Sequence, residues 1–320
     1  MKSKITFLFA IFSIIFFSNT NAQQIAVKDT LQYKPVALAD PFILLHEGKY
    51  YAYGTSSPDG ICVYVSDNLL TWTKPENPLA LHKKDVWGDS RFWAPEVYFI
   101  NGLFYMYYSA DEHICVATSA SPLGPFVQDV KQPMFDEKGI DNSLFIDDDG
   151  RAYLFFVRFT DGNAIWVAEL EKDYKTIKIN TLRLCFAASG TWESDLGKVN
   201  EGAFCIKRND IYYLTYSAND FRSQNYGVGY AVGKDIMGKW TKYEGNPILQ
   251  KAGNLVGTGH HALFTDKDGQ LRIVFHSHNS KQNVSPRLMH IGTLRFVEQE
   301  GKTIINIDKN YISPKIIETF

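Results

Sequence analysis

Three acidic residues lie at the start of apolar, strand-like segments that are far apart in the chain: Asp40, Asp141 and Glu201. If the fold gathered them in one concave site, their charges would repel one another, and at least one pKa would rise as acid–base catalysis requires. Each residue alone is as well explained as a turn cap or as the first residue of a strand. Their shared place in an internal repeat makes a purely structural role for all three the weaker interpretation.

The repeat is a hairpin that recurs five times. Its units start at Asp40, Ala94, Asp141, Glu201 and His260, which are 54, 47, 60 and 59 residues apart. Each unit has an apolar strand, a tight turn, a second strand rich in Tyr or Phe, and a third strand. Repeats of about 40–50 residues with three or four strands are typical of propeller blades. The sequence therefore predicts an all-β fold, a five-bladed β-propeller; a jelly-roll or immunoglobulin-like sandwich is the alternative, but it needs no such repeat.

A propeller would explain how residues so far apart in sequence can act together. The innermost strand of each blade runs along the central channel, so the five unit starts are expected at the same place in each blade, around one mouth of the channel. That mouth would carry three carboxyl groups and one histidine. The segment from about residue 297 to 320, which contains the sequence TIINI, is expected to help close the ring.

Composition limits the other function classes. The chain has 320 residues, a formal net charge of −2 and 14 % aromatic residues, which excludes a disordered chain and a basic nucleic-acid-binding protein. No Pro-, Ser- or Gly-rich linker divides it, which predicts a single catalytic domain over residues 23–320. Four cysteines lie in apolar runs, where they are either buried thiols or members of a disulfide: Cys62, Cys115, Cys185 and Cys205.

Residues 1–22 have the layout of a cleavable signal peptide. Lys2 and Lys4 make the start basic, 5–17 is an apolar run, and Ala22 precedes the expected cut. A membrane-spanning helix needs roughly 20 apolar residues, whereas this run has 13. We therefore expect a secreted or periplasmic protein that is free of the membrane after cleavage, and a monomer.

Six motifs, taken in their order along the chain, resemble those of glycoside hydrolase family 43, the five-bladed propeller enzymes that attack arabinose- and xylose-containing polysaccharides. The match extends from Ala39 to Arg287, and its motifs are ADPFI, FWAPEV, IDNSLF, NEGAF, GTGHHALF and RLMHIGTLRF. The resemblance implies that Asp40 is the general base and Glu201 the general acid. It also implies that Asp141 orients the acid and tunes its pKa.

The same resemblance implies a substrate-binding set. Trp93 and Ala94, from the WAP motif, would line the sugar pocket, and Arg287 and His260 would complete it. In related arabinan-cleaving propellers the matching histidine binds a central Ca²⁺, so His260 is a candidate metal ligand, although a lone histidine among waters is a weak site for a cation that prefers oxygen. No cofactor is required, and a carbohydrate is the expected partner, with no nucleic acid. The other late histidines, His276 among them, are scattered and form no zinc motif.

The implied reaction is hydrolysis with inversion, in which the two carboxyl groups lie roughly 6.5–9.5 Å apart to leave room for water. The first candidate substrate is a terminal α-L-arabinofuranosyl residue and the second a β-xylosyl residue. An endo-acting arabinanase or xylanase on the same fold is an alternative. A fructosidase-like propeller is disfavoured because its Asn-Asp-Pro and Arg-Asp-Pro motifs are missing. A non-catalytic glycan-binding propeller would be expected to have lost its acid or its base, and both are present.

Overall fold

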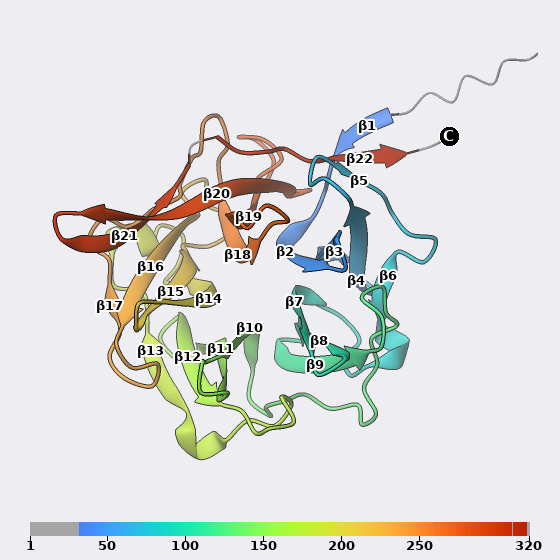
Figure 1. Ribbon diagram of the computed structural model, residues 1–320, viewed down its shortest axis with the longest axis horizontal. Helices are drawn as coiled ribbons and strands as arrows, with labels where there is room; N and C mark the ends of the chain where they lie inside the picture. The colour runs from blue at the N-terminus through green and yellow to red at the C-terminus, as the bar shows by residue number, and fades with distance from the viewer. Residues whose placement is uncertain (1–31, 309, 319–320) are drawn as a thin grey trace, which may run out of the picture.

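Five small antiparallel sheets stand around a central axis, as Figure 1 shows. The computed structural model describes residues 32–308 and 310–318, so the expected signal peptide over residues 1–22 lies outside the described residues. We number the sheets as blades 1 to 5 in chain order. This arrangement confirms the predicted five-bladed β-propeller.

Each blade begins with its strand at the channel and continues outward. Blade 1 contains β2 (Ala39–His46), β3 (Lys49–Ser57), β4 (Gly60–Ser66) and β6 (Leu79–His82). Blade 2 contains β7 (Trp93–Ile100), β8 (Leu103–Ala110) and β9 (His113–Ser119). Blade 3 contains β10 (Gly139–Ile146), β11 (Ala152–Phe159), β12 (Asn163–Glu169) and β13 (Arg183–Phe186). Blade 4 contains β14 (Asn200–Arg208), β15 (Ile211–Ala218), β16 (Gly227–Gly233) and β17 (Thr241–Lys242). Blade 5 contains β18 (Gly259–Thr265), β19 (Leu271–Ser277), β20 (Leu288–Gln299) and β21 (Lys302–Ile307).

The second strand of each blade is buried on both faces because neighbouring blades pack against its sheet. In β8, with the sequence LFYMYYSA, six of the eight residues are buried. A strand with one solvent-facing side alternates apolar and polar residues, whereas a strand that is covered on both sides does not. This double burial explains why the repeated hairpins are recognised by continuous runs of Tyr and Phe.

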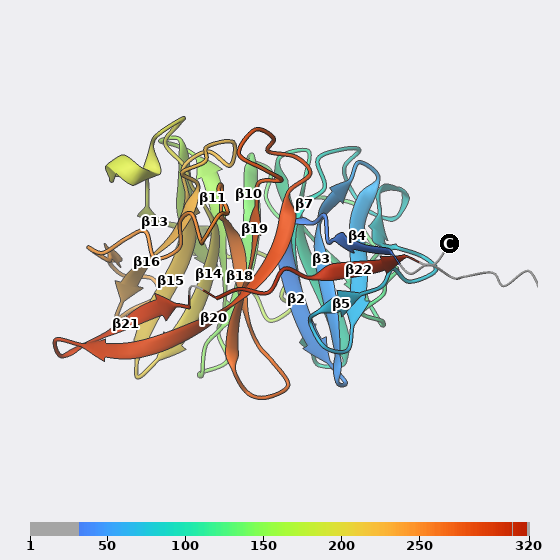
Figure 2. The ribbon, with the colours of Figure 1, turned by 90° about the horizontal axis from the view of Figure 1, so that it is seen from above.

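The inner strands form a closed ring. Each of β2, β7, β10 and β14 packs against the inner strand of the next blade, and β18 packs back against β2. The ring is held at one side by a small separate sheet of β1 (Gln32–Pro35), β22 (Lys315–Glu318) and β5 (Thr71–Trp72), seen beside blade 1 in Figure 2. β22 pairs antiparallel with β1 and parallel with β5, so it ties the C-terminal part of the chain to the N-terminal part.

The closing segment differs in detail from the expectation. The sequence TIINI forms β21, which is the outermost strand of blade 5. The strand that ties the ends of the ring is β22, with the sequence KIIE. Both are short β-branched runs that sequence alone does not distinguish, because the choice between them depends on which strands they meet in space.

All five inner strands carry a register shift next to the channel mouth. At each shift one residue has a positive φ: 49° at Asp40, 46° at Ala94, 58° at Asp141, 53° at Gly202 and 42° at His260. A bulge of this kind bends the strand and redirects a side chain. Four non-glycine residues accept an unfavourable backbone conformation here, which is typical of positions that serve a site.

The bulges correct the alignment of blade 4. The predicted repeat placed Glu201 level with the other unit starts, but the residue at the bulge is Gly202. Glu201 is still paired with Ser217 of β15, as Trp93 is paired with Ser109 in blade 2. The acid is therefore level with Trp93, one residue earlier than the two aspartates.

Two smaller expectations concern the cysteines and the membrane. The four cysteines are free thiols, of which Cys115 and Cys205 are buried.

Among the described residues, none of the helices combines the length and the apolar character that crossing a bilayer would take.

The closing strand should contribute measurably to stability. Ile316 in β22 is only 6 % exposed and lies opposite both Lys34 and Trp72. We expect Ile316→Ala to lower the free energy of unfolding by about 2–5 kcal/mol, because it leaves a cavity in a packed core. Ile317→Ala, at the half-buried neighbouring position, is the control for chemical denaturation. Equal losses in the two variants would show that β22 is not packed as described.

Candidate active site

A cavity of about 320 Å³ lies where the inner strands begin. Its walls contain six of the seven residues that the sequence predicted for the site, and they come from blades 1 to 5. The complete lining is Asp40, Trp93, Ile140, Asp141, Asn163, Val199, Glu201, Asp220, Phe221, His260 and Arg287.

Ala94 is the predicted residue that does not line the cavity. It is 4 % exposed, and its backbone N–H donates to the hydroxyl of Thr55 at 3.0 Å. The Thr55 hydroxyl in turn donates to the carboxylate of Asp40. Ala94 therefore supports the site from behind, through its backbone.

Asp40 is held in its ionised form. Burial by itself would raise its pKa, but the charge of Arg287, with smaller electrostatic contributions from His260 and His276, more than offsets burial and holds the pKa well below the usual range. Arg287 donates two hydrogen bonds to this carboxylate, from Nη1 to Oδ1 at 2.7 Å and from Nη2 to Oδ2 at 3.3 Å. A planar guanidinium that meets a carboxylate at both oxygens is the strongest of the common ion pairs.

Glu201, in contrast to Asp40, favours its protonated form. Burial raises its pKa to about 7, and the negative charge of Asp40 acts in the same direction. Two donors work against this rise: the Tyr226 hydroxyl, at 2.8 Å from Oε1, and Asn163 Nδ2, at 3.0 Å from Oε2. The site thus combines a carboxylate that stays ionised with a carboxyl that keeps its proton up to near neutral pH.

Asp141 lies close to Glu201 and is itself hard to ionise. Burial raises its pKa well above the usual range, with further contributions from the charges of Glu201 and Asp40. Its Oδ2 accepts the backbone N–H of Gly202 at 3.2 Å, directly beside Glu201. The expectation that Asp141 sits close to the acid and affects its proton is consistent with this geometry. The two carboxyl groups compete for protons, because both cannot be charged cheaply in a buried site.

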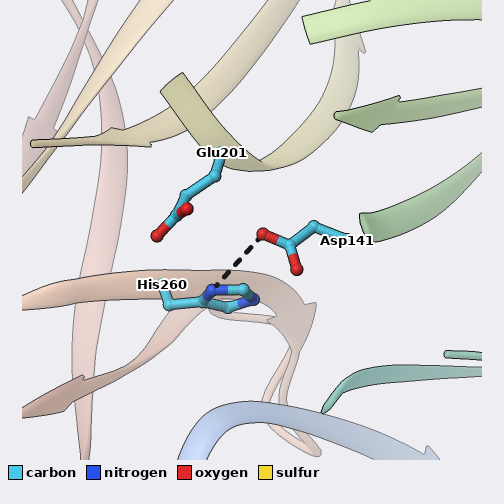
Figure 3. Close-up of side chains that lie close together, drawn as sticks. All are labelled: Asp141, Glu201 and His260. Atoms are coloured by element: carbon cyan, nitrogen blue, oxygen red, sulfur yellow. Dashed lines mark ion pairs between the residues drawn. The ribbon is translucent and has the colours of Figure 1, made fainter. Parts of the chain in front are cut away.

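His260 lies between the two aspartates. Its Nδ1 is 3.5 Å from Asp40 Oδ1 and 3.9 Å from Asp141 Oδ2, and its backbone N–H donates to Ser217 Oγ at 2.8 Å. Burial lowers the pKa of the ring, with Arg287 adding to the effect, so the ring is neutral at neutral pH. Figure 3 shows His260, Asp141 and Glu201 directed toward one another.

These three residues do not make a calcium site of their own. One ligand atom from each lies within 4.8 Å of the other two, but calcium takes six to eight ligands, nearly all of them oxygen. Both oxygens of Glu201 already accept hydrogen bonds, and so does Oδ2 of Asp141. A calcium ion at His260 would have to take most of its ligands from water.

Several residues of the site carry no signal in the sequence. His276, which the sequence showed only as one of several scattered histidines, is fully buried and accepts the backbone N–H of Asp40 through Nδ1 at 3.2 Å. Phe221 lines the cavity, and its ring lies 4.8 Å from the guanidinium carbon of Arg287. Asn163 and Tyr226, the two partners of Glu201, come from β12 and from the loop before β16. None of these residues stands at a unit start or was among the residues that the family resemblance implied, which are the two signals that identified the others.

The buried acid should make stability depend on pH in a defined direction. Because the pKa of Glu201 is raised in the folded state, its contribution is fully present below the unfolded value near 4.5 and is lost as pH rises through about 7. We expect Glu201→Gln to melt a few degrees higher than the parent at pH 8 and to differ little at pH 5. The same change at the exposed Glu76 is the control, and a pH-independent difference for Glu201→Gln would contradict the assigned burial of charge.

Known proteins share this fold and sequence pattern. The profile of the glycosyl hydrolases family 43 matches residues 34–298. A β-D-galactofuranosidase from Aspergillus niger is 29 % identical over 265 residues, which cover 74 % of this chain and 73 % of the relative. An extracellular exo-α-(1→5)-L-arabinofuranosidase from Cellvibrio japonicus is 23 % identical over 295 residues, with 80 % and 83 % covered.

Solved structures agree with the sequence relatives. An endo-1,4-β-xylanase from Bacteroides thetaiotaomicron VPI-5482 is 46 % identical, with a TM-score of 0.86 and coverage of 90 % of this chain and 100 % of that chain. A thermostable family-43 glycoside hydrolase is 38 % identical, with a TM-score of 0.77 and coverage of 87 % and 95 %. Because the family profile spans most of the chain, and because the propeller is the fold of these structures, the chain belongs to glycoside hydrolase family 43.

Proposed function

We propose that this chain is an inverting glycosidase that releases terminal α-L-arabinofuranosyl residues, with β-xylosyl residues as the second candidate. The observation that carries the proposal is the opposite protonation of two carboxyl groups in one cavity. Asp40 is kept ionised by Arg287, and Glu201 is kept protonated by burial. Hydrolysis of a glycosidic bond needs one group of each kind.

In the proposed reaction Asp40 takes a proton from a water molecule as the water oxygen attacks the anomeric carbon. The bond from that carbon to the glycosidic oxygen breaks, and Glu201 gives its proton to the departing oxygen. The product has inverted configuration because water enters on the face opposite the leaving group. Asp40 then carries a proton and Glu201 has none, so exchange with solvent resets the pair.

Other residues of the cavity would hold the sugar. Trp93 presents an aromatic ring from blade 2, and Phe221 presents another from the loop between β15 and β16. Arg287 keeps N–H groups beyond those bonded to Asp40, and these can donate to sugar hydroxyls. Asp141 would act on Glu201 rather than on the sugar, by competing with it for a proton and through its hydrogen bond to the neighbouring Gly202.

The size of the cavity favours action on a chain end. A volume of about 320 Å³ is at the lower end of the ~300–1,000 Å³ of small-molecule sites, which suits one terminal sugar better than a polysaccharide backbone. An endo-acting enzyme is the second candidate, because the structure with 46 % identity is that of an endo-1,4-β-xylanase. Arabinofuranosidases and a galactofuranosidase among the relatives make furanosyl ends the first choice.

We further propose export and action as a monomer outside the cytoplasm. The basic, apolar and small-residue order of residues 1–22 supports cleavage after Ala22. Three of the arabinofuranosidase relatives are extracellular enzymes. A polysaccharide substrate is too large to enter a cell intact, which is consistent with this location.

Removal of the acid and removal of the base should reduce activity in different ways on substrates with good and poor leaving groups. A dinitrophenolate leaves without protonation, so Glu201→Ala should keep much more activity on a dinitrophenyl glycoside than on an oligosaccharide. Asp40→Ala removes water activation, so both activities should fall together, by roughly 10²–10⁴-fold. Steady-state kinetics on both substrates, with the exposed Glu76→Ala as control, measure the contrast. Equal losses for Glu201→Ala on the two leaving groups would show that Glu201 is not the proton donor.

The stereochemistry of the product provides a separate test. We expect proton NMR of fresh digests of an aryl α-L-arabinofuranoside to show the β-anomer first, because water attacks directly. First appearance of the α-anomer would instead indicate a covalent intermediate on Asp40. Digestion of arabinan and xylan in parallel distinguishes the two modes, since an exo enzyme releases single sugars and an endo enzyme releases oligosaccharides.

A further inference from the structure

The two oxygens of Glu201 have partners of different kinds. Oε1 accepts the hydroxyl of Tyr226, a residue that is 0 % exposed and does not line the cavity. Oε2 accepts the side-chain amide of Asn163, which is half-buried and does line it. The carboxyl group therefore turns Oε1 toward the protein interior and Oε2 toward the cavity.

The Tyr226 hydroxyl donates its proton to a single acceptor among the described residues, Oε1 of Glu201. If the acid proton sat on Oε1, it would point at the tyrosine oxygen, and the tyrosine proton would be left buried without an acceptor, which is unfavourable. Burial and the neighbouring charge of Glu201 raise the pKa of Tyr226 well above its usual value, so the hydroxyl remains a donor.

The Tyr226 ring is held rigidly enough to impose this direction. It is stacked on His276, with ring centroids 5.6 Å apart and planes at 12°, and His276 in turn holds the backbone of Asp40. The ring also lies directly on the backbone of Gly259 in β18, where an added Cβ would be 2.4 Å from a ring carbon. Glycine at this place in the GTGHHALF motif leaves room for the ring.

Asn163 suits the oxygen that gains and loses the proton. Its backbone N–H donates to the Lys198 carbonyl at 3.0 Å, which fixes its position at the start of β12. A primary amide has a donor on one side and an acceptor on the other. It can donate to Oε2 when Glu201 is ionised, and after rotation it can accept the proton when Oε2 carries one.

We propose that Tyr226 places the catalytic proton of Glu201 on Oε2, the oxygen that faces the substrate, and that Asn163 partners this oxygen in both protonation states. The inference rests on the proposed role of Glu201 as general acid. During bond cleavage the proton passes from Oε2 to the glycosidic oxygen. The ionised carboxylate that remains then accepts hydrogen bonds from Tyr226 and Asn163. Tyr226 and Asn163 are positioning residues for the acid.

The test compares Tyr226→Phe with the parent on aryl glycosides whose leaving groups range from dinitrophenolate to poor ones. We expect about a tenfold or greater loss of kcat/KM on the poorest leaving group and less than about threefold on dinitrophenolate. Loss of a donor to the ionised carboxylate raises its pKa, so the basic limb of the pH–rate profile should move to higher pH. Asn163→Ala should change both readouts in the same direction.

Tyr230→Phe is the matched control, because Tyr230 is buried in β16 and stacks on Tyr243, away from Glu201. It should leave the leaving-group dependence and the pH profile unchanged. A uniform loss for Tyr226→Phe across all leaving groups, with an unmoved basic limb, would overturn the inference. If Glu201→Ala is sensitive to the leaving group while both positioning variants are not, this inference alone fails; if Glu201→Ala is also insensitive, the proposed function fails.

Discussion

The bulge at the start of each inner strand is the constraint on which the site depends. An ordinary strand alternates its side chains between the two faces of its sheet, and in a propeller both faces are covered by neighbouring blades. The register shift with a positive φ at Asp40, Asp141 and His260 turns these side chains toward the channel instead. Because the five inner strands form a closed ring, five local distortions become one cavity.

The electrostatic surroundings give two chemically similar carboxyl groups different protonation states. Asp40 and Glu201 are both buried carboxyls, yet their protonation differs because Arg287 holds Asp40 at both oxygens while Glu201 has only neutral donors. Such an arrangement costs stability, since carboxyl groups crowd in a place that water reaches poorly, where burial opposes the ionisation of Glu201 and Asp141. Sites with this cost persist where function requires them.

The residues behind Asp40 and Glu201 hold these two carboxyl groups in place. Thr55 and His276 hold Asp40, Asn163 and Tyr226 hold Glu201, and the His276–Tyr226 stack connects the two groups. The base and the acid are therefore not independent: a displacement of this stack would disturb both. The small-residue positions near the site, such as Gly259, are explained by the rings that pack on them.

The sequence by itself was enough to predict the number of blades, the all-β class and the three carboxyl groups. A hairpin repeat is local, and its apolar and aromatic strands follow from burial on both faces, so five units can be counted without knowing how they pack. Asp40, Asp141, Glu201 and His260 stand at unit starts of the repeat, whereas Trp93 and Arg287 are implied only by the resemblance to the family motifs. Periodicity and residue type predict where these four side chains gather, and the resemblance supplies their roles.

Tertiary structure decided what depends on contacts between blades. The one-residue difference between Glu201 and the bulge at Gly202 is a matter of strand register, which turn and partner strand set together. β22 rather than β21 ties the ends of the ring because only β22 reaches β1 and β5. Asn163, Tyr226 and His276 lie 38, 25 and 236 residues from the carboxyl-bearing residues that they hold. Nothing in their local sequence marks them, since these hydrogen bonds exist only after the strands of a blade, or the strands of neighbouring blades, have packed together.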